Sequence, residues 1–423
     1  MNQDITMFLI ICSALVLFMT PGLAFFYGGL VRASSVVSMM MMSFGSLGLI
    51  GVMWVVFGYA ISFGNAGQGN FVGLDGVYGI DLNKLFLNDV VAAAKQGDGF
   101  GLSFAGFQGT FAIVTVALIS GAIADRAKFG SWMIFAALWA LLVYFPVAGW
   151  IFNFTLTDGV ITDGGWLVKD LGVMDFAGGT VVEIASGASA LALALVVGRR
   201  FGFKKGMHAP HNVPLVLIGV AILWFGWFGF NAGSELAADG VASLAFINTL
   251  AAPVGGMLSW ALYERLAHGK STAVGAGSGV IAGAVAITPA CAFIDPIWAL
   301  LLGVVVGVFC AMAIELKYKL GFDDSLDVVG VHLVGGLVGT IWIGIFGQHV
   351  GFALGFGFDQ VLKQIAGAAI VGGYAFGVSY LIGILIQKTI GMRVTSTDEI
   401  AGIDLIQHEL AYDSKDPRWS WRG

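Results

Sequence analysis

The sequence predicts an all-α polytopic membrane protein. It should have eleven transmembrane helices, an outside N-terminus, an inside C-terminus and an inverted pseudo-twofold repeat. Three observations predict this fold: the composition, the long apolar segments, and the distribution of Lys and Arg. Of the 423 residues, 58% are hydrophobic and only 11% are charged, and the mean hydropathy is +0.90. Soluble domains carry about 25% charged residues, so this composition excludes an ordinary water-soluble globule.

Glycine and cysteine usage agree with a helical membrane protein. The chain contains 63 glycines, about 15% of its residues against a usual value of about 7%. Small residues let helix backbones approach closely inside a membrane. Cys12, Cys291 and Cys310 lie in apolar segments without paired spacing, and the six histidines form no HxxxH pattern. The sequence therefore predicts no metal site, no disulfide and no cofactor.

Eleven apolar segments approach or exceed the length of about 18 residues that crosses a bilayer. They are residues 6–31, 39–63, 102–124, 130–152, 175–198, 213–233, 241–262, 271–292, 295–316, 327–346 and 361–388. No Lys or Arg precedes the first segment, so we interpret it as a retained span and not as a cleaved signal peptide. The chain then divides into a transmembrane domain, residues 1–390, and a cytoplasmic tail, residues 391–423.

The basic residues predict the orientation, because cytoplasmic loops are enriched in Lys and Arg. With the N-terminus outside, 16 of the 20 basic residues fall inside, including Lys204, Lys205, Lys415, Arg418 and Arg422. Only Lys84, Lys95, Lys169 and Lys363 fall outside. Spans 1–5 and 6–10 form two blocks of odd length, so the second block is inverted relative to the first, an architecture common among transporters.

Two ionisable residues inside the spans are candidates for chemistry. A charged side chain at the centre of a membrane helix costs about 2.5–3.5 kcal/mol, so each one needs a reason. From the helical rise, Glu183 in span 5 lies about 12 Å below the outer face and His332 in span 10 about 7.5 Å above the inner face. We expect them to form a pair near the midplane that shares a proton. The alternative is two unrelated buried polar groups, each bonded to the backbone.

Two aspartates open the same pair of spans. Asp175 begins span 5 with DFAGG, and Asp327 begins span 10 with DVVGVH. A carboxylate at a helix start accepts free backbone amides and faces the positive end of the helix dipole. We predict that Asp327 is a structural cap. For Asp175 two roles stay open, a cap and the attraction of a cation from outside.

Aromatic residues line two other spans. In span 6, Trp227, Phe230, Asn231 and Ser234 share one helical face, and in span 3, Phe107 and Phe111 are one turn apart. Aromatic faces attract cations as water is removed. The alternative is ordinary core packing or an aromatic belt at the lipid interface.

These motifs resemble a known family. FQGTF, DFAGGTVV, GWFGFNAGS and DVVGVH, in this order, are similar to those of the ammonium transporter (Amt/Mep/Rh) family over residues 6–390. The resemblance implies an eleven-helix protomer of a homotrimer in the cytoplasmic membrane, with one narrow hydrophobic pore in each protomer. Ammonium or ammonia would be the substrate.

The resemblance also implies roles for individual residues. Phe111 and Phe230 match the stacked aromatics of the outer gate. Phe107 and Ser234 match the external ammonium site, beside which Asp175 would lie. Trp227 would line the pore, and His332 matches the second of the family's two pore histidines.

Two positions depart from the family pattern. Glu183 stands where the first pore histidine is expected, as in some fungal members, so a Glu183–His332 proton relay is our inference from this substitution. Phe152 stands where the outer-site tryptophan is expected, with Trp150 two residues earlier and Trp166 in a following loop. This substitution predicts an incomplete aromatic cage.

The sequence thus predicts an ammonium transporter and not an enzyme, because no nucleophile and base are paired and no metal site is present. NH4+ would lose its proton, and NH3 would pass the pore while the proton moves through Glu183 and His332.

One alternative is an ammonium sensor that acts through the tail, and another is a passive channel for NH3 or CO2. The tail resembles the segment that couples protomers and engages a PII-type regulatory protein. It could equally be a solvated segment that closes the inner face. No nucleic-acid partner is predicted.

Overall fold

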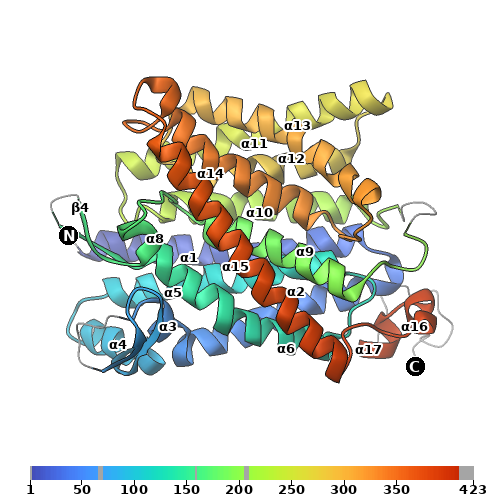
Figure 1. The fold of residues 1–423 in the computed structure, drawn as a ribbon, viewed down its shortest axis with the longest axis horizontal. Helices are drawn as coiled ribbons and strands as arrows, with labels where there is room; N and C mark the ends of the chain where they lie inside the picture. The colour runs from blue at the N-terminus through green and yellow to red at the C-terminus, as the bar shows by residue number, and fades with distance from the viewer. Residues whose placement is uncertain (1, 65–69, 158–159, 204–208, 409–423) are drawn as a thin grey trace.

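The computed structural model describes residues 2–64, 70–157, 160–203 and 209–408. Long helices lie side by side in one bundle, and the two chain ends lie at opposite ends of it (Figure 1). Helices α4 and α8 lie at the end that carries the N-terminus, whereas α16 and α17 lie at the end that carries the C-terminus. We call these the outer and the inner end, following the predicted orientation.

The α-helices are α1 (Asn2–Leu30), α2 (Val36–Met53), α3 (Tyr59–Ser62), α4 (Asn88–Lys95), α5 (Phe100–Ile119), α6 (Phe129–Trp139), α7 (Phe145–Phe152), α8 (Trp166–Lys169), α9 (Ala185–Val197), α10 (Val213–Gly233), α11 (Gly240–His268), α12 (Ala273–Ile287), α13 (Pro296–Leu320), α14 (Val334–Phe346), α15 (Asp359–Thr389), α16 (Ser396–Ala401) and α17 (Asp404–His408). Four π-helical segments interrupt or precede these helices: Trp54–Gly58, Ala140–Tyr144, Gly179–Ile184 and Val329–Leu333. Short 3₁₀ turns occupy Ala33–Ser35, Leu82–Leu87, Ser120–Ile123 and Phe352–Leu354.

Within the described residues, ten continuous helical segments are long and apolar enough to cross a membrane. The predicted span 271–292 differs, because α12 has only 15 residues and ends at Ile287, shortly before Pro289. Most of α12 is buried, and it packs against α10, α11, α13 and α14. A helix enclosed by other helices need not match the thickness of the hydrocarbon layer, so its length says less about the membrane than that of its neighbours.

Residues 64–101 and 153–174, the two longest outside loops between the predicted spans, contain secondary structure. Strands β1 (Phe71–Leu74) and β2 (Tyr78–Asp81) pair antiparallel, with Phe71 opposite Asp81. Strands β3 (Phe154–Thr157) and β4 (Val160–Gly164) form a second hairpin. The hairpins pair backbone N–H and C=O groups in these two segments, which lie between the predicted membrane spans.

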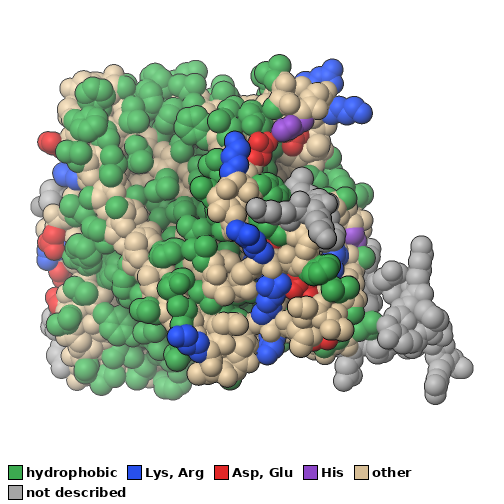
Figure 2. Space-filling view, turned by 45° about the vertical axis from the view of Figure 1, so that its right-hand side comes forward, with side chains coloured by type: hydrophobic (Ala, Val, Ile, Leu, Met, Phe, Trp, Pro, Cys, Tyr) green, Lys and Arg blue, Asp and Glu red, His purple; other side chains and the backbone are tan. Residues whose placement is uncertain are grey.

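The surface is divided by residue type. On the face that Figure 2 shows, hydrophobic side chains cover broad areas, whereas Lys and Arg side chains gather mainly toward the inner end. The described part of the tail packs at this end. Glu399 accepts a hydrogen bond from the backbone of Phe201 (2.6 Å) and pairs with Arg393 (2.6 Å). Residues 409–423 and the basic residues Lys204 and Lys205 lie outside the described residues.

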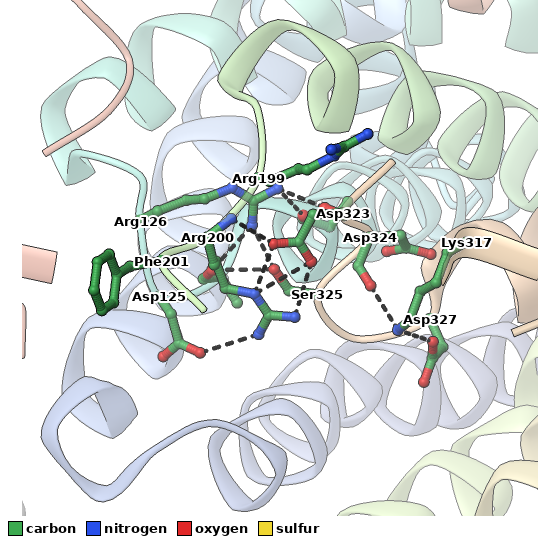
Figure 3. Close-up of polar contacts among 12 residues, drawn as sticks. Asp125, Arg126, Arg199, Arg200, Phe201, Lys317, Asp323, Asp324, Ser325 and Asp327 are labelled. Carbon is green, nitrogen blue, oxygen red and sulfur yellow. Dashed lines mark hydrogen bonds and ion pairs between the residues drawn. The ribbon is translucent and has the colours of Figure 1, made fainter. Parts of the chain in front are cut away.

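A buried charge network ties the inner ends of several helices together (Figure 3). The side chain of Arg126 is fully buried. Its guanidinium donates to the carbonyl oxygens of Ala122, Ala124, Gly198 and Asp323 and to the Ser325 hydroxyl. Arg200 pairs with Asp323 at 2.9 Å and with Asp125 at 3.3 Å. We call Asp125, Arg126, Arg200, Asp323 and Ser325 the inner polar cluster.

The geometry of the inner polar cluster requires a guanidinium. Burial lowers the pKa of Arg126 to about 10, so the side chain stays charged at neutral pH. Its planar fork reaches five acceptors from three separate segments of the chain, which an ammonium group with three donors could not do.

We expect Arg126→Lys to lower the free energy of unfolding by about 2–4 kcal/mol, because several buried acceptors lose their donors. Thermal unfolding of the purified protein in detergent would measure the change. Arg199→Lys is the matched control, since Arg199 is an exposed neighbour whose side chain, within the described part of the chain, has one hydrogen bond, to the carbonyl of Gly321. Equal stability of the two variants would contradict a structural role for the Arg126 network.

Candidate functional site

Glu183 and His332, which are 149 residues apart in the sequence, meet in the interior of the bundle. The distance between Glu183 Oε2 and His332 Nδ1 is 2.6 Å. The two side chains are 1% and 4% exposed. The carboxylate and the imidazole are thus within hydrogen-bond distance of each other and shielded from solvent. The structure thus brings together the two residues that the sequence proposed as a pair.

Both residues lie in π-helical turns, Glu183 in Gly179–Ile184 and His332 in Val329–Leu333. π-Helical turns are rare and occur frequently at functional sites. The two turns contact each other and begin two helices, α9 and α14, that continue to opposite ends of the bundle.

Two glycines allow the helices to approach closely at the pair. Gly187 lies four residues after Glu183, and a Cβ there would be 2.4 Å from the backbone nitrogen of Leu333. Gly336 lies four residues after His332, and a Cβ there would be 2.9 Å from the Cβ of Glu183. Any larger residue must push one helix away from the other.

Asp175 anchors the start of the Glu183 segment. Its Oδ1 accepts the amides of Gly178 (2.8 Å) and Gly179 (2.7 Å), and its Oδ2 accepts the amide of Thr180 (2.8 Å) and the Thr180 hydroxyl. Of the two roles left open for Asp175, the cap is therefore visible in the geometry.

The corresponding cap of the second segment is Asp324, and the prediction of Asp327 as the cap is wrong. Oδ2 of Asp324 accepts the amide of Val329 at 2.7 Å. The Asp327 carboxylate instead forms an ion pair with Lys317, and its backbone has a left-handed φ of 64°. Asp324 lies eight residues before His332, just as Asp175 lies eight residues before Glu183. Burial raises the pKa of Asp324 to about 6, with the nearby Lys317 charge opposing this shift.

Four phenylalanines lie on the outer side of the pair. The rings of Phe111 and Phe230 stack with centroids 4.0 Å apart and an interplanar angle of 22°. Phe107 meets Phe111 edge-on at 4.8 Å, and Phe152 does so at 6.3 Å. All four rings thus belong to one connected group.

The positions of Phe152 and Trp150 bear on the predicted substitution at the outer site. Phe152 also lies beside the backbone of Gly178, where a Cβ would be 3.5 Å from its ring. Trp150 points away, since its indole donates to the carbonyl of Val77 and its ring packs against Trp166 and Tyr374. Between these two residues, it is Phe152 that reaches the Phe111 group.

Ser234 and Trp227 lie on either side of Phe230 along α10. The Ser234 hydroxyl donates to the carbonyl of Phe230 at 2.9 Å. The Trp227 indole donates to the hydroxyl of Thr288 at 2.8 Å, and its ring contacts Phe230 with centroids 5.9 Å apart. Trp227 is thereby fixed in one orientation by a hydrogen bond at one end and a ring contact at the other.

Phe230 and the Glu–His pair line one narrow cavity of about 10 Å³, which is room for about one water molecule. It is lined by Met19, Leu23, Phe26, Val114, Leu118, Val182, Glu183, Leu223, Trp227, Phe230, Ile281 and His332. Apart from Glu183, His332 and the fixed indole of Trp227, this lining is apolar.

Comparison with known proteins decides the family. Residues 7–412 match the model of the Ammonium Transporter Family. The chain belongs to the ammonium transporter family. It is 47% identical to an ammonium transporter of Mycobacterium tuberculosis, covering 96% of this chain and 90% of that protein. It is 42% identical to ammonium transporter Amt1 of Archaeoglobus fulgidus, covering 95% and 97%.

Solved structures agree with this assignment. The structure of Saccharomyces cerevisiae Mep2 is similar with a TM-score of 0.81 and 32% identity, over 94% of this chain and 91% of that one. A protein described as a Sensor Amt Protein is similar with a TM-score of 0.87 and 27% identity, over 96% and 98%. This member of the ammonium transporter family is therefore a multi-pass protein of the cell membrane.

Sequence reasoning missed three partners of the site in this ammonium transporter family member: Asp324, Lys317 and Thr288. Asp324 had a signal, because its eight-residue spacing to His332 repeats the spacing of Asp175 to Glu183. Lys317 and Thr288 had no such signal in the sequence. Lys317 lies in α13 and Thr288 directly follows α12, and the direction in which each side chain points depends on how these helices pack.

We expect Gly187→Ala to reduce ammonium transport about ten-fold or more, because separating two interacting groups by a fraction of an ångström is costly in a preorganised site. Ammonium uptake into proteoliposomes measures the effect, with thermal unfolding in parallel. Gly373→Ala is the matched control. Gly373 lies in the membrane helix α15, and apart from its own turn of helix no atom of the described residues lies within 4 Å of the added methyl group. Normal uptake by Gly187→Ala would show that the close approach is dispensable.

Proposed function

We propose that this protein transports ammonium across the cytoplasmic membrane by binding NH4+ outside, removing its proton, and passing NH3 and the proton separately. It would act as a carrier and not as an enzyme. The observation that supports this proposal is the Glu183–His332 pair, which lines a narrow and mostly apolar cavity together with Phe230, whose ring stacks on Phe111.

The outer site would recruit the cation by aromatic faces and a fixed negative charge. Phe107, Phe152 and the Ser234 hydroxyl surround the outer side of the stacked rings, and aromatic faces attract a cation more strongly as water is removed. Both carboxylate oxygens of Asp175 are committed to backbone amides. Asp175 would therefore act on NH4+ through its charge and by holding the outer end of the Glu183 segment.

The apolar cavity would select against ions. A bare cation in a dry passage loses its hydration energy and gains no partner, whereas neutral NH3 loses much less. Deprotonation lets ammonium avoid this cost. K+ and Na+ cannot lose a proton, so they would be excluded without any dedicated selectivity filter.

The proton would travel through the Glu–His pair. When NH4+ dissociates into NH3 and H+, Glu183 or His332 accepts the proton, and the 2.6 Å contact allows its transfer between the carboxylate and the imidazole. The proton then leaves on the inner side, where it recombines with NH3. Net movement of one charge with each ammonia makes the process electrogenic.

The topology would follow the predicted pattern of eleven spans, with α12 as the short eighth one and the N-terminus outside. The gathering of Lys and Arg at the inner end supports this orientation. The repeated spacings support an inverted repeat, because Asp175, Glu183 and Gly187 match Asp324, His332 and Gly336. We also propose a homotrimer with one pore in each protomer, and a tail that engages a PII-type regulatory protein.

A second candidate is an ammonium sensor. The similarity to a Sensor Amt Protein at a TM-score of 0.87 favours it. If the protein is a sensor, binding of ammonium at the outer site would change the packing of the tail, through contacts such as that of Glu399 with Phe201. A sensor would bind ammonium with little transport, and a passive gas channel would conduct NH3 without current.

Ammonium-pulse currents from proteoliposomes distinguish these functions. The wild-type protein should give a saturable current with NH4+ and none with K+. Glu183→Gln should fold normally but lose most of the current, because the relay loses its carboxylate. The matched control is Glu315→Gln, the same change in a solvent-exposed Glu–His contact (Glu315 Oε1 to His268 Nε2, 2.9 Å), which should leave the current unchanged. An unchanged current in Glu183→Gln would refute the relay, and a wild type without current would favour the sensor or the gas channel.

We expect Phe152→Trp to strengthen binding at the outer site. An indole attracts cations better than a phenyl ring, by an amount on the order of 0.5–1 kcal/mol at a partly exposed position. The ammonium concentration that gives half-maximal current should therefore fall a few-fold, with a smaller change in the maximal current. Phe154→Trp, on the exposed strand β3, is the control and should change neither value.

A further inference from the structure

A buried lysine lies at the inner end of the bundle, beside the segment that carries His332. Lys317 is on α13, and its side chain is only 6% exposed. Its Nζ donates to the carbonyl oxygen of Asp324 at 2.8 Å and forms an ion pair with the Asp327 carboxylate (Figure 3). The same Nζ lies 5.5 Å from the ring centroid of Tyr318.

The partners of Lys317 are those that would bind an ammonium ion. A carboxylate, a carbonyl oxygen and an aromatic face each attract a small organic cation with N–H donors. In addition, Oδ1 of Asp324 is buried and has no hydrogen-bond partner among the described residues. The lysine head group is itself an alkylammonium, so its position shows that this site accepts the chemistry of the proposed substrate.

The site opens to a cavity of about 600 Å³ at the inner end. Lys317 and Asp327 line this cavity together with Arg200, Asp125 and Glu264. Arg200 is already paired with Asp323 and Asp125, and Glu264 accepts hydrogen bonds from the backbone and hydroxyl of Thr272. The Asp327 side chain is 33% exposed, so a cation in the cavity could reach it if Lys317 were absent.

The backbone at Asp327 has a left-handed φ of 64°, which non-glycine residues seldom adopt. Backbone strain of this kind persists where the surroundings fix the conformation, and it clusters at functional sites. Here the ion pair to Lys317 and the hydrogen bond from Val331 N to the Asp327 carbonyl (2.9 Å) fix it.

We propose that Lys317 is a specificity-determining residue, a tethered ammonium that occupies the cation site at the inner mouth. It keeps both newly released NH4+ and cytoplasmic K+ from binding to Asp327. This inference rests on the proposed transport function. The Lys317 ammonium is covalently attached, so it competes with free cations for Asp327 without diffusing away. Free cations therefore bind only weakly at the inner mouth and leave it quickly.

Removing the tethered charge should create a cation site. In Lys317→Met, the Asp327 carboxylate and the Asp324 carbonyl lose their resident ammonium and become available to K+, which resembles NH4+ in size and charge. K+ is the probe because it should bind to this site without being carried through the pore. Lys317→Gln is a second variant that retains hydrogen-bond donors and should fold even if the methionine variant does not.

The experiment measures ammonium-pulse currents of the full-length protein in phosphatidylcholine–phosphatidylglycerol liposomes, with either KCl or choline chloride on both sides. The wild type should give equal currents in both salts. In Lys317→Met and Lys317→Gln the current in KCl should fall about three-fold or more, because occupancy of the new site follows mass action. Lys319→Met, an exposed lysine two residues away on the same helix, should behave as the wild type does.

The double variant Lys317→Met, Asp327→Asn provides the decisive comparison. It lacks both charges, so its current should again be equal in the two salts. The inference about Lys317 is wrong if the single variants carry equal currents in KCl and choline chloride, or if the current of the double variant is still lower in KCl. In either case the transport function stands. If the wild type carries no current in either salt, the transport function itself fails.

Discussion

The structure depends on keeping two ionisable side chains in contact inside an apolar bundle. Water would weaken the Glu183–His332 contact, and lipid would penalise either group alone. The surrounding features serve this constraint. Gly187 and Gly336 let the two helices touch, and Asp175 and Asp324 fix the starts of the segments that carry the pair. The rings of Phe111 and Phe230 stack on the other side of the cavity that the pair lines.

Much of the fold could be predicted because the membrane leaves few choices. A run of apolar residues must be a helix, and the distribution of basic residues orients it. The contact between Glu183 and His332 could be anticipated for the same reason, since depth in a membrane follows directly from position along a helix. The helix α12 shows the limit of this argument, because its glycine-rich sequence is explained by neighbouring helices and not by lipid.

The remaining details depend on local geometry that no pattern encodes. Asp324 and Asp327 are both aspartates near the start of one helix. Asp324 accepts the amide of Val329, whereas the Asp327 carboxylate forms an ion pair with Lys317. The sequence could not say where the Trp150 side chain points, two residues before Phe152. Its indole donates to the carbonyl of Val77, in the turn between β1 and β2. In both cases a hydrogen bond from a distant or irregular segment determines where the side chain points.

The inner polar cluster also has a consequence for how the chain is assembled. The guanidinium of Arg126 is bound partly by Asp323 and Ser325, which follow it by about 200 residues. During synthesis these acceptors do not yet exist when the first five helices enter the membrane. Arg126 therefore cannot complete its set of hydrogen bonds until synthesis has reached residue 325, because the last of its acceptors arrive with that segment.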